Sequence, residues 1–215
     1  MKIQFLPILN FKNGYFLNNL PSFCQFRKVG QAQIIDRKTG EEINATIKKE
    51  NMLDEYISYQ MLVKNNLIGY IDITVHPEAP KKAEQNANNP ISYETMPEVS
   101  HLRSIEGDKY AKIGSTLINL AIEESKNHDG KGAIWLEAEK GYKKAESAYR
   151  SDENPIPFYY KLGFRAVDQS DEKIRQLIEN GNIEELPDKA ILVLEPDNIS
   201  YNAYLARNYS FINKK

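Results

Sequence analysis

The pattern of apolar and polar residues predicts short strands along most of the chain. The expected strands cover residues 31–37, 43–48, 56–63, 67–75, 99–105, 132–138, 164–167 and 190–194. Lys64, Asn65 and Asn66 separate the third of them from the fourth, and this turn chemistry predicts a β-hairpin. The sequence therefore favours a fold built around a sheet.

From residue 113 the apolar spacing becomes that of a helix, expected over 113–127. The residues on its apolar face are Ile113, Leu117, Leu120 and Ala121. A turn at Gly107 and Asp108 precedes this helix, so its first N–H groups have no intrahelical partners. Such a helix start attracts phosphate, and Lys109 and Lys112 add positive charge beside it. A second amphipathic helix is expected over 170–180.

The segment 154–164 (Asn-Pro-Ile-Pro-Phe-Tyr-Tyr-Lys-Leu-Gly-Phe) predicts a short helix that feeds a strand. Asn154 suits the N-cap, and Pro155 and Pro157 suit the first turn, where no intrahelical N–H is needed. Gly163 suits the left-handed residue just past the helix end. The helix is expected to turn three side chains to the layer beneath it, namely Phe158, Tyr159 and Leu162.

Residues 158–164 resemble the FYxKLGF signature of the GNAT superfamily of N-acetyltransferases. The loop before Gly114 resembles the loop with which that superfamily holds the pyrophosphate of acetyl-CoA, written R/Q-x-x-G-x-G/A. Aligned on Gly114, Lys109 takes the first position and Lys112 the middle glycine. Lys in place of Arg keeps the charge but loses the bidentate fork. Lys in place of Gly is unfavourable only if that residue needs a positive φ.

The resemblance covers roughly residues 50–197 and implies an α/β fold of the α+β type, with a mixed, mainly antiparallel sheet flanked by helices. It implies transfer of an acetyl group from acetyl-CoA to a primary amine, by direct attack in a ternary complex. Residues 102–104 would then pair with the pantetheine arm like an added strand. The cofactor-binding residues that it implies are Leu102, Arg103, Ser104, Lys109, Tyr110, Ala111, Lys112, Ile113, Gly114, Ser115, Asn154, Phe158 and Lys161.

Few residues can carry such chemistry. By the resemblance Tyr159 is the general acid near the thioester sulfur, and a phenol with a pKa of about 10 stays protonated at neutral pH. The alternative role for Tyr159 is packing against the sheet, and Tyr160 is expected to face the surface or the cofactor. No general base stands out. His101 has a suitable pKa and is a weak candidate, and weaker ones are the carboxylates of Glu98, Glu106, Glu137 and Glu139.

Composition narrows the function classes further. The 215 residues carry a net charge of −2, which argues against nucleic-acid binding through bulk electrostatics. The single cysteine, Cys24, excludes an internal disulfide and fits a reducing compartment. No apolar run approaches the roughly 20 residues of a membrane-spanning helix, and the N-terminus has the character of a strand rather than of a signal peptide. The histidines are scattered, so no metal site is expected; they are His76, His101 and His128.

We therefore expect a cytoplasmic protein, although export by a route without an N-terminal signal stays open. A single domain is expected over residues 1–215, with its core at about 28–197. Three segments extend the core: an aromatic-rich N-terminal extension (1–27), a long loop (76–97) and an aromatic C-terminal tail with helical spacing (198–215).

Several alternatives stay open. The acceptor can be a small molecule or a peptide amine, and the chain can form a homodimer. Lys109, Lys112 and the long loop motivate a first alternative function, a catalytically silent module of the same fold that binds CoA or a protein partner. The second is a non-enzymatic interaction protein that acts through its aromatic termini.

Overall fold

The structure, a computed structural model, describes residues 26–52, 55–75, 96–140, 154–168, 170–200 and 202–212. The expectations for the N-terminal extension before residue 26, for Cys24 and His76, and for the long loop up to residue 95 lie outside the described residues.

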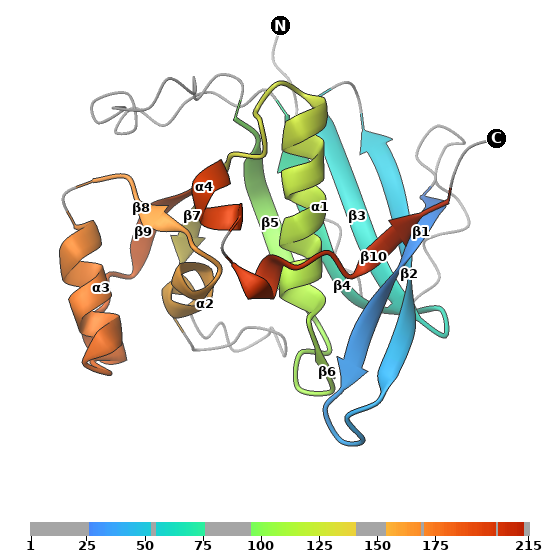
Figure 1. The fold of residues 1–215 in the computed structure, drawn as a ribbon, viewed down its shortest axis with the longest axis horizontal. Coiled ribbons are helices and arrows are strands. Elements are labelled where there is room, and N and C mark those ends of the chain that lie inside the picture. The colour runs from blue at the N-terminus through green and yellow to red at the C-terminus, as the bar shows by residue number, and fades with distance from the viewer. Residues whose placement is uncertain are drawn as a thin grey trace, which may run out of the picture.

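A ten-stranded sheet forms the frame of the described residues, in the order β10-β1-β2-β3-β4-β5-β7-β9-β8, with β6 paired to β1 (Figure 1). Its strands are β1 (Arg27–Asp36), β2 (Glu42–Met52), β3 (Tyr56–Val63), β4 (Asn66–Thr74), β5 (Glu98–Ser104), β6 (Tyr110–Ala111), β7 (Ile134–Glu139), β8 (Arg165–Ala166), β9 (Lys189–Leu194) and β10 (Tyr209–Phe211). The pairing of β5 with β7 is parallel, and all the others are antiparallel. The predicted mixed and mainly antiparallel sheet is confirmed.

The hairpin of β3 and β4 forms where the sequence predicted it. Lys64 and Asn65 occupy its two turn positions with φ of 51° and 67°. Left-handed conformations at both positions give the turn the twist of its flanking strands. The side chains then alternate, so that β3 turns Tyr59 and Met61 to the core.

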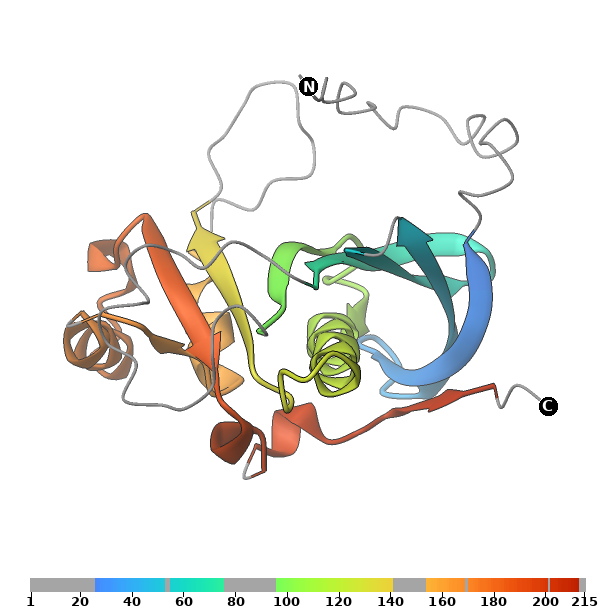
Figure 2. The same cartoon turned by 90° about the horizontal axis from the view of Figure 1, so that it is seen from above.

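Helices cover one face of this sheet. They are α1 (Ile113–Asn127), α2 (Ile156–Lys161), α3 (Asp171–Glu179) and α4 (Pro196–Ser200), with short 3₁₀ turns η3 (Ile183–Glu185) and η4 (Ala203–Leu205). α1 approaches β4 closely at Gly69, where an added Cβ would lie 2.6 Å from Cγ2 of Ile113. α1 and α2 lie on the same face of the sheet, and α1 is the helix nearer to β5 (Figure 1 and Figure 2).

A buried polar cluster ties α1 to the sheet beneath it. The carboxylate of Glu124 is only 3% exposed, and it accepts hydrogen bonds from the Tyr59 hydroxyl and, at 2.8 Å, from Nζ of Lys49. Nε2 of His128 lies 3.7 Å from the other carboxylate oxygen. Burial, followed by the neighbouring carboxylate, raises the pKa of Tyr59, so this phenol stays protonated and donates.

The C-terminal tail departs from the helical spacing of its aromatic residues. After η4 the chain runs along α1 and adds β10 to the edge of β1, with Tyr209 opposite Ala32. Asn208 fixes this path, because its Nδ2 donates to the Gln33 carbonyl at 2.6 Å and to Oγ1 of Thr116 at 2.8 Å. Pairing with the free edge of β1 thus decides the structure of this segment, and the helical spacing of its aromatic residues does not.

Candidate active site where β5 and β7 diverge

The two parallel strands in the middle of the sheet separate almost at once. In the described part of the chain, β5 and β7 share a single register pair, Glu98 with Trp135, close to the first residue of each strand. Their carboxyl ends therefore diverge, and the loop that leaves β5 leads to the start of α1. The divergence leaves part of β5 without a neighbouring strand on the β7 side.

The backbone groups that face this gap can be assigned from the hydrogen bonds of β5. The Ile105 N–H donates to the Ile68 carbonyl at 2.9 Å, so the backbone of Ile105 faces β4. Since backbone groups alternate along a strand, Arg103 also faces β4, whereas Leu102 and Ser104 face the gap. Of the three residues expected to pair with pantetheine, Leu102 and Ser104 therefore have backbone groups on the side of the gap, and Arg103 has them on the side of β4. Its backbone belongs to the sheet.

The start of α1 has the properties of an anion site. Its N-cap, Lys112, makes no side-chain capping bond, and the first turn carries no acidic residue. The first helical hydrogen bond comes from the Thr116 N–H, so the N–H groups of Ile113, Gly114 and Ser115 precede the helical ladder. The positive end of the helix dipole adds to these donors.

Lys112, at the middle-glycine position of the motif that this loop resembles, has a positive φ. It has φ of 71° and ψ of 2°, the left-handed conformation that glycine adopts without strain. The conformation of the glycine position is thus kept by a lysine whose exposed side chain brings a positive charge to the start of α1. Lys109 is exposed too, and contact with the Tyr110 hydroxyl raises its pKa.

Tyr110 and Ala111, which the resemblance implies bind the cofactor, are part of the sheet. They form β6, with Ala111 opposite Ile35 and Tyr110 opposite Asp36, and the Tyr110 side chain is buried. The Tyr110 N–H donates to the Glu106 carbonyl at 2.9 Å. The N–H groups at the start of α1 that precede the helical hydrogen bonds therefore all come after Ala111.

α2 brings the second motif to the start of α1. Gly163 has φ of 97°, as the sequence predicted, whereas the N-cap of α2 is Pro155 and not Asn154. Asn154 lies one residue earlier, and its Oδ1 accepts from the Ile156 N–H at 3.0 Å. The ring of Phe158 lies over Gly114, where an added Cβ would lie 2.8 Å from its Cζ atom. Phe158 is 37% exposed, so it borders the start of α1 instead of packing into the core as expected.

Tyr159 is the buried member of the motif. It is 8% exposed, and its ring packs edge-on against Phe158 and Phe164, with centroids 5.2 and 5.4 Å away. No hydrogen bond joins its hydroxyl to another residue that the structure describes. Burial raises the pKa of Tyr159 to about 12, which keeps the phenol protonated and able to donate.

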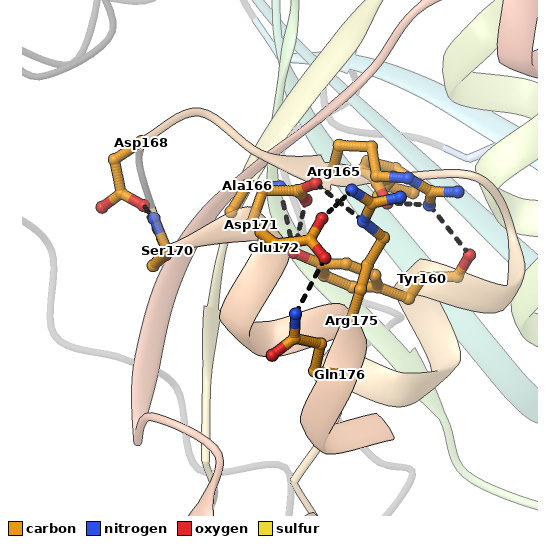
Figure 3. Close-up of polar contacts among 10 residues, drawn as sticks. Tyr160, Arg165, Ala166, Asp168, Ser170, Asp171, Glu172, Arg175 and Gln176 are labelled. Atoms are coloured by element: carbon orange, nitrogen blue, oxygen red, sulfur yellow. Dashed lines mark hydrogen bonds and ion pairs between the residues drawn. The ribbon is translucent and has the colours of Figure 1, made fainter. Parts of the chain in front are cut away.

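Tyr160 is buried, contrary to the expectation that it faces the surface or the cofactor. Its hydroxyl donates to Oδ1 of Asp171 at 2.8 Å and accepts from the Ala166 N–H at 3.2 Å (Figure 3). Arg175 holds the same carboxylate, with Nε 3.3 Å from Oδ2 of Asp171. This network fixes α2, and with it Tyr159, against β8 and α3.

Three of the candidate bases, His101, Glu98 and Glu137, lie on the other face of the sheet from α1. His101 is exposed and pairs across the strands with Asp72, and its Nδ1 lies 3.7 Å from Oδ2 of that residue. Glu98 stands at the point where β5 meets β7. Burial and then the nearby Glu137 raise the pKa of Glu98. Glu137 itself is bound to Nζ of Lys189 at 2.7 Å.

Within the described ranges, no cluster of three or more His, Cys, Asp or Glu side chains is arranged to hold a metal ion. None of the helices in that part of the chain has the length and apolarity to cross a membrane.

Comparisons with known proteins find likeness in fold only. No protein-family model and no curated protein sequence matches the chain. One similar solved structure is described as a streptothricin acetyltransferase from Bacillus anthracis in complex with acetyl coenzyme A; it is 15% identical, with a TM-score of 0.38 over 86% of this chain and 94% of that one. Another is an aminoglycoside 6′-N-acetyltransferase from Enterococcus faecium, 16% identical, with a TM-score of 0.37 over 66% and 74%.

A third similar structure is a nourseothricin acetyltransferase, 12% identical, with a TM-score of 0.38 over 80% of this chain and 88% of that one. All three are named as acetyltransferases, the class of enzyme that the sequence resemblance implied. At such low identities and TM-scores, each residue's role has to be argued from this chain itself.

Proposed function

We propose that the chain is an N-acetyltransferase that moves the acetyl group of acetyl-CoA to a primary amine. The observation that carries this proposal is the divergence of β5 from β7 next to the uncapped start of α1. An extended arm can add to the free side of β5 while a phosphate group meets the N–H groups of α1. Acetyl-CoA combines such an arm with a pyrophosphate in one molecule.

The binding residues divide by the kind of contact they offer. Leu102 and Ser104 offer backbone groups toward the gap, and Gly114 and Ser115 offer N–H groups at the start of α1. Lys112 offers a mobile charge to the pyrophosphate. Acetyl-CoA supplies an activated acetyl group as a thioester, and holding both substrates in position supplies a large share of the rate enhancement.

Tyr159 is proposed as the proton donor. The amine nitrogen forms a bond to the acetyl carbon while the bond from that carbon to sulfur breaks, and the departing sulfur takes the proton of the Tyr159 hydroxyl. Its pKa of about 12 keeps the Tyr159 phenol protonated at neutral pH, so its O–H can donate to the negative charge that develops on the departing sulfur. Solvent then returns the proton to the phenolate.

Glu98 is proposed as the base that accepts the proton of the amine. Its raised pKa makes its carboxylate a better proton acceptor near neutral pH than an exposed glutamate. It lies at the pairing of β5 with β7, on the face of the sheet away from α1 and Tyr159, so the amine is proposed to approach from that face; His101 is exposed and lies further along β5 toward Ser104. A primary amine of a small molecule or of a peptide fits this chemistry.

The test is turnover. Purified protein is mixed with acetyl-CoA and, separately, an aliphatic diamine, an amino sugar and a peptide with a free N-terminus, and free CoA thiol is measured. The proposal expects amine-dependent thiol release that falls strongly in Glu98→Gln and Tyr159→Phe but not in Tyr56→Phe, an exposed tyrosine on β3. Cofactor binding without turnover of any amine would favour a silent CoA-binding module instead.

A further inference from the structure

A β-bulge in β5 brings His101 to the face of the sheet that carries Glu98. In the pairing of β4 with β5, Thr74 lies opposite Glu98 and Asp72 lies opposite His101, and the register shifts between these two pairs. Ser100 is the extra residue of this shift. Without it, residues 98 and 101 would point to opposite faces, because side chains alternate along a strand. The bulge thus adds a titratable side chain to the face from which the amine is proposed to approach.

The imidazole of His101 is oriented by side chains of the neighbouring strands. Its Nδ1 lies 3.7 Å from Oδ2 of Asp72, and the Ser58 hydroxyl donates to Oδ1 of the same carboxylate at 2.6 Å. Ser58 is buried, so one oxygen of the carboxylate is anchored in the sheet while the other lies beside the ring. A carboxylate beside Nδ1 favours a proton on that nitrogen and leaves Nε2 to accept one.

The two sides of Glu98 differ in polarity. On the side of β7 lies Trp135, the register partner of Glu98, which is buried in an apolar cluster. On the side of β4 lie the hydroxyls of Thr74 and Ser100, whose oxygens are 2.7 Å apart. His101 comes next along β5 and its side chain is 72% exposed. Polar groups therefore lead from Glu98 to an exposed imidazole.

The charges around Glu98 couple it to the same imidazole. Burial and then the carboxylate of Glu137 raise the pKa of Glu98, whereas the charge of His101 lowers it. Glu137 is itself bound to Nζ of Lys189 at 2.7 Å. Histidine is the side chain whose charge changes near neutral pH, so protons on Glu98 and on His101 influence each other.

We propose that His101 carries the proton of the acceptor amine from Glu98 to solvent. The amine gives this proton to the Glu98 carboxylate as its nitrogen bonds to the acetyl carbon. Nε2 of His101 then takes the proton, which leaves an imidazolium beside the Asp72 carboxylate, and releases it to water. An acceptor that lies over Glu98 covers this carboxylate, whereas the exposed ring keeps contact with solvent. The inference rests on the proposed function, and His101 acts through Glu98 without touching the amine.

The dependence of turnover on buffer tests this relay. Thiol release is measured at constant pH and ionic strength, with rising concentrations of imidazole, for the wild type, His101→Gln and the control His128→Gln. Glutamine can still contact Asp72 but cannot carry a proton. In dilute buffer His101→Gln is expected to lose up to about 10²-fold in kcat, the low end of general acid–base catalysis, with the KM for acetyl-CoA unchanged.

Added imidazole is expected to restore the kcat of His101→Gln and to leave the wild type and His128→Gln as they are. A kcat of His101→Gln equal to that of the wild type would overturn the relay. A loss that imidazole does not restore would overturn it too, because His101 would then have a structural role.

An NMR titration separates the relay from the proposed function. Glutamate carboxyl groups are labelled with carbon-13, and the signal of Glu98 is identified by its absence in Glu98→Gln. The pKa of Glu98 is expected to be higher in His101→Gln than in the wild type, because the charge that lowers it is removed. An unmoved pKa would overturn the relay even in an active enzyme. A higher pKa in a protein that acetylates no amine would leave the coupled pair standing and overturn the transferase.

Discussion

Removing one oxygen atom, in Tyr159→Phe, separates catalysis from packing in this protein. The ring would keep its edge-on contacts with Phe158 and Phe164. Only the proton donor is lost. A positioned general acid contributes about 10²- to 10⁴-fold to a rate, so kcat is expected to fall by that factor. The KM for acetyl-CoA is expected to change little, because the hydroxyl is assigned to the leaving sulfur.

The same change should not destabilise the fold. No hydrogen bond joins the Tyr159 hydroxyl to another residue that the structure describes, so the substitution breaks none of the described contacts. Tyr159→Phe is therefore expected to leave the free energy of unfolding nearly unchanged at neutral pH.

The dependence of stability on alkaline pH tests the same residue, Tyr159, in a second way. Burial raises the pKa of Tyr159 from 10.0 to about 12 in the folded protein. Because the pKa of Tyr159 is higher in the folded protein, raising the pH ionises this phenol more readily in the unfolded chain. The free energy of unfolding is therefore unaffected by this group below pH 10 and falls as the pH rises toward 12. The difference amounts to about 3 kcal/mol. Tyr159→Phe should lack that part of the alkaline loss, while the other tyrosines contribute equally to both proteins.

The assay pairs thiol release with urea unfolding at several pH values, on the wild type, Tyr159→Phe and the control Tyr56→Phe. Turnover of Tyr159→Phe equal to that of the wild type would remove Tyr159 from the proton-donor role. A large loss of stability at neutral pH would show instead that its hydroxyl has a structural partner.

Three further changes test other parts of the structure. Lys112→Gly is expected to raise the free energy of unfolding by about 1 kcal/mol, because a left-handed lysine is strained, and to weaken acetyl-CoA binding through the lost charge; thermal unfolding and calorimetry measure the two effects, and an unchanged melting temperature would contradict the strain. Tyr160→Phe is expected to lower stability by about 1–3 kcal/mol, because it leaves the Asp171 carboxylate short of a donor; denaturant unfolding checks this, and a neutral result would refute the anchoring of α2. Lys49→Met is expected to lower stability by about 3 kcal/mol, because it removes the cation from the buried carboxylate of Glu124; the loss should shrink in the background of Glu124→Gln, and equal losses in both backgrounds would argue against the pair.

Local sequence signals predicted the parts of the fold that depend on neighbouring residues. The β3–β4 hairpin followed from turn residues that adopt left-handed conformations, and the end of α2 followed from Gly163. The start of α2 lies one residue later than predicted, with Pro155 as its N-cap. α1 began at Ile113 and ended at Asn127, as its apolar spacing indicated. These features need no knowledge of distant partners.

The parts that depend on distant partners were missed. The partner of the Tyr160 hydroxyl comes from a different helix, 11 residues along the chain, so no local pattern could place that ring inside. The tail became a strand because β1 offered a free edge. Which backbone groups of β5 face the gap depends on the register with β4, and so Arg103 could not be separated from Leu102 by sequence.

The candidate site was predicted as a set of residues but not as an arrangement. The motif identified Tyr159 and Gly114, yet the contact of Phe158 with Gly114 joins two segments far apart in sequence. The raised pKa of Glu98 depends on burial and on Glu137 of another strand.

The most direct test of the account is calorimetric titration of the purified protein and of Lys112→Glu with acetyl-CoA, with ATP as the control ligand. We expect micromolar binding that is selective for acetyl-CoA over ATP and is weakened in Lys112→Glu, because the loop before α1 holds the pyrophosphate. Absence of acetyl-CoA binding, or equal binding by Lys112→Glu, would contradict the assignment of the site to the gap between β5 and β7 and the start of α1.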